Sequence, residues 1–136
     1  MTFLGKLWLR PRGPWLDALP AVAYLAVLFW FGLIPLKSLP GPDFELADKV
    51  WHAGAFGGLA ALLSRVGLQL GLRGLGAARF GALGATLLGG ALEVLQSFTR
   101  YRSADWADFL ADALGAALAY AALRGLRAGA PPEGSG

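Results

Sequence analysis

The stretch FGALGATLLGGALEVLQSF, residues 80–98, is 19 residues long and is interrupted only by Glu93 and Gln96. At about 1.5 Å per residue, a helix of this length spans nearly all of a ~30 Å hydrocarbon core. Three further apolar stretches of comparable length surround it, over residues 18–36, 49–72 and 106–123. No alternating β pattern competes, and a backbone in lipid must satisfy its own hydrogen bonds. The sequence therefore predicts an all-α polytopic membrane protein built as a bundle of four transmembrane helices.

The composition supports a membrane protein. Of 136 residues, 56% are hydrophobic and 15% are charged, whereas soluble domains carry roughly a quarter charged residues. We expect a single membrane domain over 1–127 and a flexible tail over 128–136, which is rich in Gly, Pro and Ser. Cysteine is absent, which excludes disulfides and thiolate metal sites. The net charge of +3 comes without any Lys/Arg run, so no nucleic-acid partner is expected.

Single residues mark the ends of two spans. Pro20 would occupy the first turn of the first span, where a missing N–H is tolerated. Arg65 interrupts the second span near its end, and we expect its long stem to reach the lipid headgroups.

The distribution of Lys and Arg predicts the orientation. Eight cations would lie on one side of the membrane and four on the other: Lys6, Arg10, Arg12, Arg65, Arg73, Arg79, Arg124 and Arg127, against Lys37, Lys49, Arg100 and Arg102. By the positive-inside rule both termini are cytoplasmic. The expected location is a bacterial cytoplasmic membrane.

Polar side chains from three spans would then gather at the outer end of the bundle, facing the periplasm or the cell exterior. Their spacing places each set on one helical face. The sets are Asp48 with His52, Glu93 with Gln96 and Arg100, and Asp105 with Asp108 and Asp112. At about 1.5 Å per residue, all lie within ~10 Å of the outer boundary, so we expect them to converge.

Small residues repeat at four-residue spacing on two spans. The rows are Ala77, Gly81, Ala85 and Gly89, which continue to Glu93, and Ala107, Ala111, Gly115 and Ala119. Such seams let membrane helices approach closely. We therefore expect Glu93 to point into the bundle, and the seams also offer a route to a homo-oligomer.

These residues resemble a known family. The segments Asp48–His52, Glu93–Gln96 and Arg102–Gly115 match the patterns D-K-x-x-H, E-x-x-Q and G-R-S-x-x-x-x-D-x-x-x-N-x-x-G of the VanZ-like family of small bacterial membrane proteins. The match covers about half of the chain. Tyr101 stands where the family often has Gly, and Asp112 where it often has Asn.

The resemblance implies work at the outer leaflet on envelope lipids or lipid-linked precursors, with a link to glycopeptide (teicoplanin) resistance. On that interpretation the protein binds or modifies a lipid-linked, phosphate-bearing component. The candidate acid/base groups are His52, Glu93 and Asp108. The candidate substrate-binding residues are Asp48, Lys49, Gln96, Arg100, Arg102, Asp105 and Asp112, the arginines being suited to phosphate oxygens.

Other interpretations stay open. No cofactor is predicted, but a divalent metal ion at His52, Glu93, Asp108 and Asp112 is conceivable. The same groups would also serve a non-enzymatic accessory or scaffold protein, in which acids neutralise Arg102 and His52 and hold three helices together. Lys49 would then be an interfacial cation. A small oligomeric transporter using the acids as proton relays is a third class. The sequence leaves open whether any reaction is catalysed.

Overall fold

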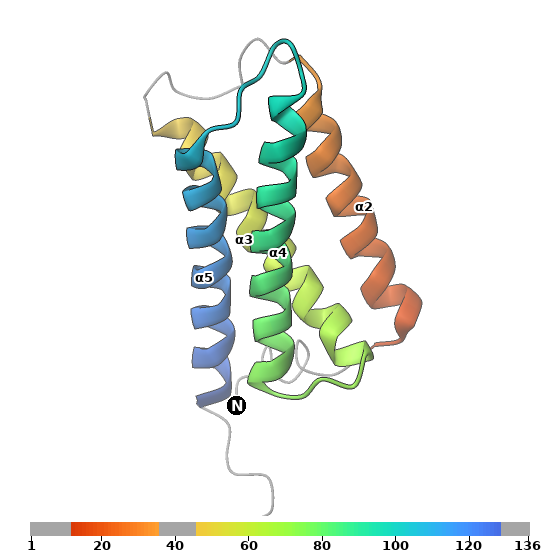
Figure 1. Ribbon diagram of the computed structural model, residues 1–136. Helices are drawn as coiled ribbons and strands as arrows, with labels where there is room; N and C mark the ends of the chain where they lie inside the picture. The colour runs from red at the N-terminus through yellow and green to blue at the C-terminus, as the bar shows by residue number, and fades with distance from the viewer. Residues whose placement is uncertain (1–11, 36–45, 129–136) are drawn as a thin grey trace, which may run out of the picture.

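The computed structural model describes residues 12–35 and 46–128, and within these ranges it contains four helices and no strand. The helices are α2 (Pro14–Leu33), α3 (Ala47–Gln69), α4 (Leu75–Ser97) and α5 (Trp106–Ala128), as Figure 1 shows. The all-helical prediction is confirmed. Some predictions lie outside the described residues: those for the tail beyond Ala128, for Lys6, Arg10 and Lys37, and for the end of the first span at residue 36.

The first helix begins earlier than predicted. Pro14 lies at its first positions, where the fixed φ of proline suits a helix start. Pro20 therefore lies inside α2, and its predicted place in the first turn is wrong. The helix ends at Leu33, because Ile34 is extended (φ −85°, ψ 152°), the conformation favoured before a proline, here Pro35.

The other predicted boundaries also shift by a few residues. α3 ends at Gln69, three residues before the predicted end, and a tight turn through Gly71 and Gly74 follows. Both glycines have positive φ (83° and 67°), which other residues adopt with strain. α4 consequently starts at Leu75, five residues before the apolar stretch that predicted it.

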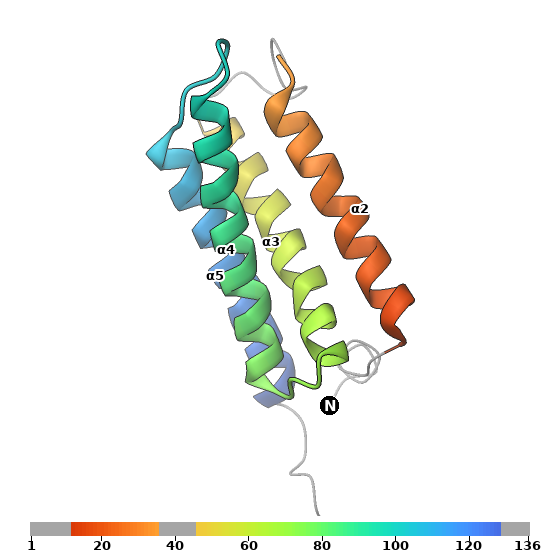
Figure 2. The same cartoon turned by 45° about the vertical axis from the view of Figure 1, so that its right-hand side comes forward.

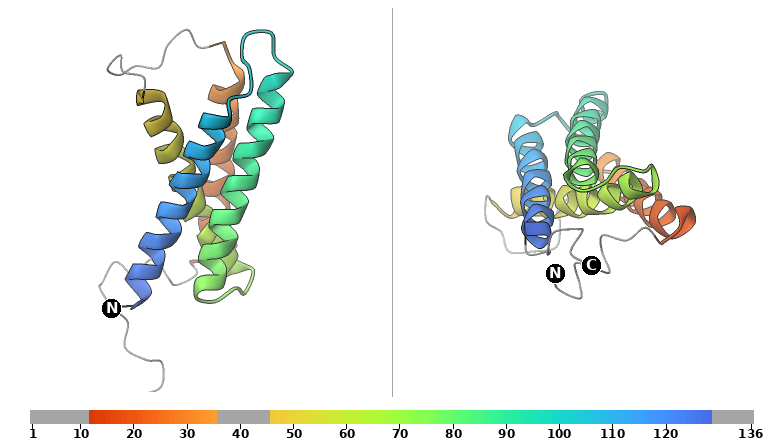
Figure 3. Two further views of the ribbon diagram at one scale, coloured as in Figure 1. Left: turned by 60° about the vertical axis from the view of Figure 1, so that its left-hand side comes forward. Right: turned by 90° about the horizontal axis from the view of Figure 1, so that it is seen from below.

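The central helix of the bundle is α3. It contacts each of the other three helices, α4 and α5 most extensively. It runs obliquely, so that its first turns lie beside α5 and its last turns beside the start of α2 (Figures 1 and 2). The view along the bundle in Figure 3 places α3 between α5 and α2. One helix thus meets different partners at its two ends.

Three of the four helices, α2, α4 and α5, are long and apolar enough to cross a membrane. α3 does not meet the same hydropathy and charge limits, although its 23 residues are sufficient in length. Two polar side chains in its second half are buried: Arg65 is 3% exposed and Ser64 is 4% exposed. Polar side chains of membrane-spanning helices usually face the interior of the bundle, as these two do.

Small residues set the close approach of α3 to its neighbours. The row Ala77, Gly81, Ala85 and Gly89 is buried and leads to Glu93, so the predicted inward face of α4 is confirmed. A methyl group on Gly81 would collide with the Ala60 carbonyl oxygen on α3, and one on Gly115 with the Ala53 carbonyl oxygen. In the second row Gly115 and Ala111 are buried, Ala119 is half-buried and Ala107 is exposed.

Candidate functional site

Polar side chains gather where α3 and α5 begin and α4 ends, which we call the His52 end. Lys49, in the first turn of α3, lies among three acidic side chains. Its Nζ donates to Asp105 Oδ2 at 2.9 Å, to Asp108 Oδ1, and to Asp48 Oδ2 at 3.5 Å. Lys49 is therefore the counter-ion of three acids and not a free interfacial cation. Asp108 lies on α5 and Asp105 in the turn before it, so the ammonium group of Lys49 joins α3 to α5.

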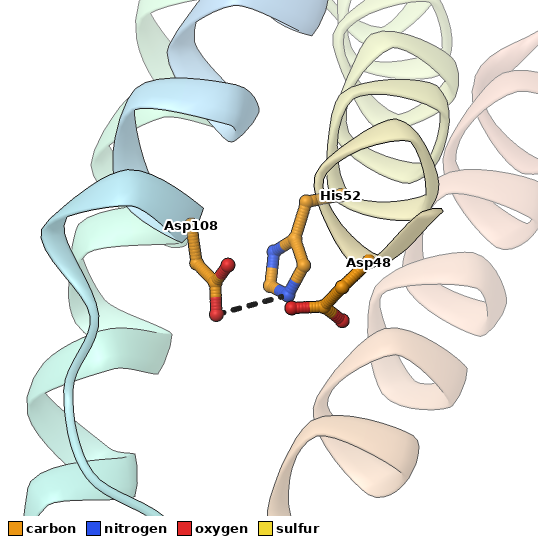
Figure 4. Close-up of side chains that lie close together, drawn as sticks. All are labelled: Asp48, His52 and Asp108. Atoms are coloured by element: carbon orange, nitrogen blue, oxygen red, sulfur yellow. Dashed lines mark ion pairs between the residues drawn. The ribbon is translucent and has the colours of Figure 1, made fainter. Parts of the chain in front are cut away.

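His52 lies one turn deeper in α3, on the same face. Its Nδ1 is 2.8 Å from Asp112 Oδ1, and its Nε2 is 3.5 Å from Asp108 Oδ2. Figure 4 shows the ring between Asp108, on α5, and Asp48, its own i−4 neighbour. Both ring nitrogens thus face carboxylates, which fixes the orientation of the imidazole and suits it to gain or lose a proton.

Glu93 and Asp112 form the buried wall of the site. Glu93 is 6% exposed and Asp112 is 0% exposed. Glu93 Oε2 accepts a hydrogen bond of 2.8 Å from the backbone N–H of Asp105. Within the described residues, however, Glu93 Oε1 and Asp112 Oδ2 are buried and have no hydrogen-bond partner. Such groups are rare in folded proteins and call for an explanation.

The α2–α3 pocket, about 210 Å³ in volume, adjoins this cluster. Its polar lining residues are Asp48, His52, Gln96 and Arg102, and its apolar lining includes Leu28, Phe31, Trp51, Phe56 and Leu92. In the described part of the chain the Arg102 guanidinium makes no hydrogen bond or ion pair. Lys49 is thus the counter-ion of Asp48, Asp105 and Asp108, and Arg102 is left lining the pocket.

A second hollow, the α4–α5 groove, is lined by Glu93. It measures about 500 Å³, and its lining is apolar apart from a few groups, among them Glu93 and Asp105. Leu87, Val94 and Phe109 form part of its wall. Both hollows therefore reach the His52 end of the bundle.

The structure places the remaining predicted site residues differently. Gln96 is 2% exposed, and its Nε2 donates to the Gly32 carbonyl oxygen of α2 at 2.9 Å, which ties α4 to α2. Arg100 is exposed, and no hydrogen bond or ion pair joins it to the described residues of the cluster. Tyr101, where the family pattern has Gly, donates to the Leu33 carbonyl oxygen at 2.6 Å.

A buried polar cluster at the opposite end, where α3 ends and α2 begins, was not predicted. Arg65 Nε donates to Asp17 Oδ1 at 2.7 Å, and Gln69 Nε2 donates to Asp17 Oδ2 at 2.6 Å. The expectation that Arg65 reaches toward headgroups is wrong, because its side chain is turned inward to Asp17. The signal was present in the sequence: Arg65 and Gln69 are four residues apart, and the predicted topology puts Asp17 at the same end.

One pKa at the His52 end bears on its electrostatics. Asp105, in the turn before α5, has a lowered pKa because Lys49 donates a hydrogen bond to it. The backbone N–H of Ala107 adds a second hydrogen bond in the same direction. This carboxyl group is therefore ionised at neutral pH and holds Lys49 in place.

No family model matches the chain, and no curated protein or solved structure matches it either.

Proposed function

We propose that the chain is a four-span protein of a bacterial cytoplasmic membrane, of the VanZ-like kind, that binds a lipid-linked phosphate. In this proposal both termini are cytoplasmic, α3 is the fourth span, and the His52 end faces the periplasm or the cell exterior. The observation that carries it is the Arg102 side chain, which lines the α2–α3 pocket and has no side-chain hydrogen bond or ion pair with the residues that the structure describes.

The lining of the pocket supports a lipid ligand. Leu28, Phe31 and Trp51 offer an apolar wall for an acyl or prenyl chain, and Arg102 offers two parallel N–H groups for phosphate oxygens. The acids of the cluster repel an anion, but Asp48 is the only one that lines this pocket. A headgroup at Arg102 therefore avoids most of the negative charge.

His52 gives the site chemical capacity. It lines the same pocket and lies 2.8 Å from Asp112, a pairing in which a carboxylate orients an imidazole for proton transfer. Glu93 and Asp108 are the further acid/base candidates. Binding is the core of the proposal, and a reaction on the bound headgroup would be an additional activity. A link to teicoplanin resistance rests on the resemblance alone.

Binding of a polyprenyl phosphate to the detergent-purified protein tests the proposal. Trp51, one of five tryptophans, lines the pocket, so a change in tryptophan fluorescence that Trp51→Phe removes reports the binding. We expect Arg102→Gln to weaken binding by about tenfold or more, since a charge-assisted hydrogen bond contributes ~1.5–3 kcal/mol. Arg100→Gln, which removes an exposed arginine nearby, is the matched control and should bind as the wild type does. The neutral polyprenol should bind more weakly than its phosphate.

Equal affinity of Arg102→Gln and wild type would remove the proposal.

One observation favours a different function, a scaffold with a purely structural network. Lys49 ties α3 to α5, and Gln96 ties α4 to α2, through contacts that need no ligand. Absence of any saturable binding of the phosphate lipid would favour that alternative.

A further inference from the structure

The two edges of the His52 ring face two different sets of carboxylates. On one side, ligand atoms of Asp48, His52 and Asp108 lie within 4.8 Å of one another (Figure 4). On the other, ligand atoms of His52, Glu93 and Asp112 do the same. We call these the exposed triad and the buried triad. Each has the donor types and the dimensions of a metal site, so other observations must decide between them.

Lys49 already neutralises the exposed triad. Its Nζ contacts both acids, Asp48 at 3.5 Å and Asp108 more closely. A metal ion at this place would have to displace the ammonium group. Half of the Asp48 side chain is also open to solvent. The exposed triad is therefore an ordinary charge cluster with its own cation.

The buried triad has no such partner. Glu93 Oε1 and Asp112 Oδ2 are the two described buried side-chain atoms that lack any hydrogen bond. Both side chains are more than nine-tenths buried, and both belong to the triad. Two carboxylate oxygens withdrawn from water without a donor are costly. Because both carboxylates belong to one group with His52, whose ligand atoms lie within 4.8 Å of one another, we infer that something positively charged belongs among them.

We propose that the buried triad binds one divalent transition-metal ion, Mn²⁺ or Zn²⁺. One imidazole nitrogen and two carboxylate oxygens suit such ions, and water fills the remaining positions. Three helices supply one ligand each: His52 from α3, Glu93 from α4 and Asp112 from α5. The ring nitrogen that binds the ion must be deprotonated, so any proton it carries is released to solvent on binding.

Further contacts orient the ligands. The backbone N–H of Asp105 holds Glu93 Oε2 at 2.8 Å, and Oε1 is left without a hydrogen bond. Asp108 Oδ2 lies 3.5 Å from His52 Nε2, as an outer carboxylate does beside many metal-bound histidines. The ion would also reduce the excess negative charge of the His52 end. This site stands on the positions of its own side chains and does not depend on the proposed lipid ligand.

The first test is titration of Mn²⁺ into the detergent-purified protein, followed by electron paramagnetic resonance of the free ion. The protein is purified through a tag without histidine. We expect one saturable site per chain, with Zn²⁺ competing for it. Glu93→Gln and Asp112→Asn should each weaken Mn²⁺ binding at least tenfold. Asp48→Asn, which alters the exposed triad alone, should change it by less than twofold.

The second test needs no variant, so it holds even where a substitution prevents folding. His52 is the single histidine of the chain, so ¹⁵N-histidine labelling reports on this ring alone. Stoichiometric Zn²⁺ should shift its ring signals, and Mn²⁺ should broaden them. Unchanged signals at millimolar ion would overturn the proposal. Loss of Mn²⁺ binding in Asp48→Asn but not in Glu93→Gln would also overturn it.

Discussion

Arg65 and Asp17 form a buried ion pair of 2.7 Å between the end of α3 and the start of α2. The two residues are 3% and 2% exposed. A second contact, of 2.8 Å, joins His52 to Asp112 near the start of α3. A polar contact therefore lies near each end of this helix. The oblique path of α3 explains the arrangement, because its first turns meet α5 and its last turns meet α2 (Figure 3).

Breaking the Arg65–Asp17 pair should destabilise the bundle. Arg65→Met leaves Asp17 buried without its cation, so we expect the free energy of unfolding to fall by about 3–5 kcal/mol. The double variant Asp17→Asn/Arg65→Met should be more stable than Arg65→Met alone. Unfolding in mixed detergents measures both, with Arg73→Met, in the exposed turn before α4, as the control. A double variant no more stable than Arg65→Met would show that the pair is not coupled.

Gly115 is expected to be indispensable for the approach of α5 to α3. A methyl group there would collide with the Ala53 carbonyl, and the backbone cannot yield as a flexible side chain does. Gly115→Ala should lower the free energy of unfolding by about 1–3 kcal/mol. Gly125→Ala, on the same helix with open space around it, should instead raise it by about 0.5–1 kcal/mol. We expect thermal unfolding to show a lower Tm for Gly115→Ala and a higher Tm for Gly125→Ala. An unchanged Tm of Gly115→Ala would contradict the packing argument.

Lys49 should make stability depend on acid pH through Asp105. The hydrogen bond from Lys49 lowers the pKa of Asp105 in the folded protein. This contribution to stability is present at neutral pH and is lost as the pH falls through that lowered pKa. Between about pH 5 and pH 3 the Tm of wild type should therefore fall more than that of Lys49→Met. Lys49→Arg keeps the charge and should follow wild type, whereas parallel profiles for all three would refute the linkage.

The proposed orientation can be tested by cysteine labelling, since the chain has no cysteine of its own. Ser103 and Leu72 are exposed and lie in the turns at opposite ends of the bundle. In the orientation proposed above, Ser103→Cys should react with an impermeant maleimide in intact cells, after outer-membrane permeabilisation where such a membrane exists. Leu72→Cys should react only after lysis. The reverse pattern would invert the topology and move the site to the cytoplasmic side.

Helix state and the approximate positions of Glu93, Asp108 and Asp112 along their helices followed from the sequence alone. The reason is local: an apolar stretch of about 20 residues is satisfied as a helix by its own hydrogen bonds. Spacing in turn sets how far Glu93, Asp108 or Asp112 lies from a helix end. The inward face of α4 was predictable for the same reason, because a row of small residues at four-residue spacing occupies one side of a helix.

Which side chains pair with one another was decided by the tertiary structure. From the sequence, Arg102 was a candidate phosphate-binding residue or, in the scaffold interpretation, a partner of the acids, and Arg65 was expected to reach the lipid headgroups. The oblique path of α3 instead brings Lys49 to the acids at the start of α5 and Arg65 to Asp17 on α2. Pairing depends on how two helices cross and rotate against each other. That geometry comes from the contacts of Gly81 and Gly115 with α3, between residues far apart in the chain.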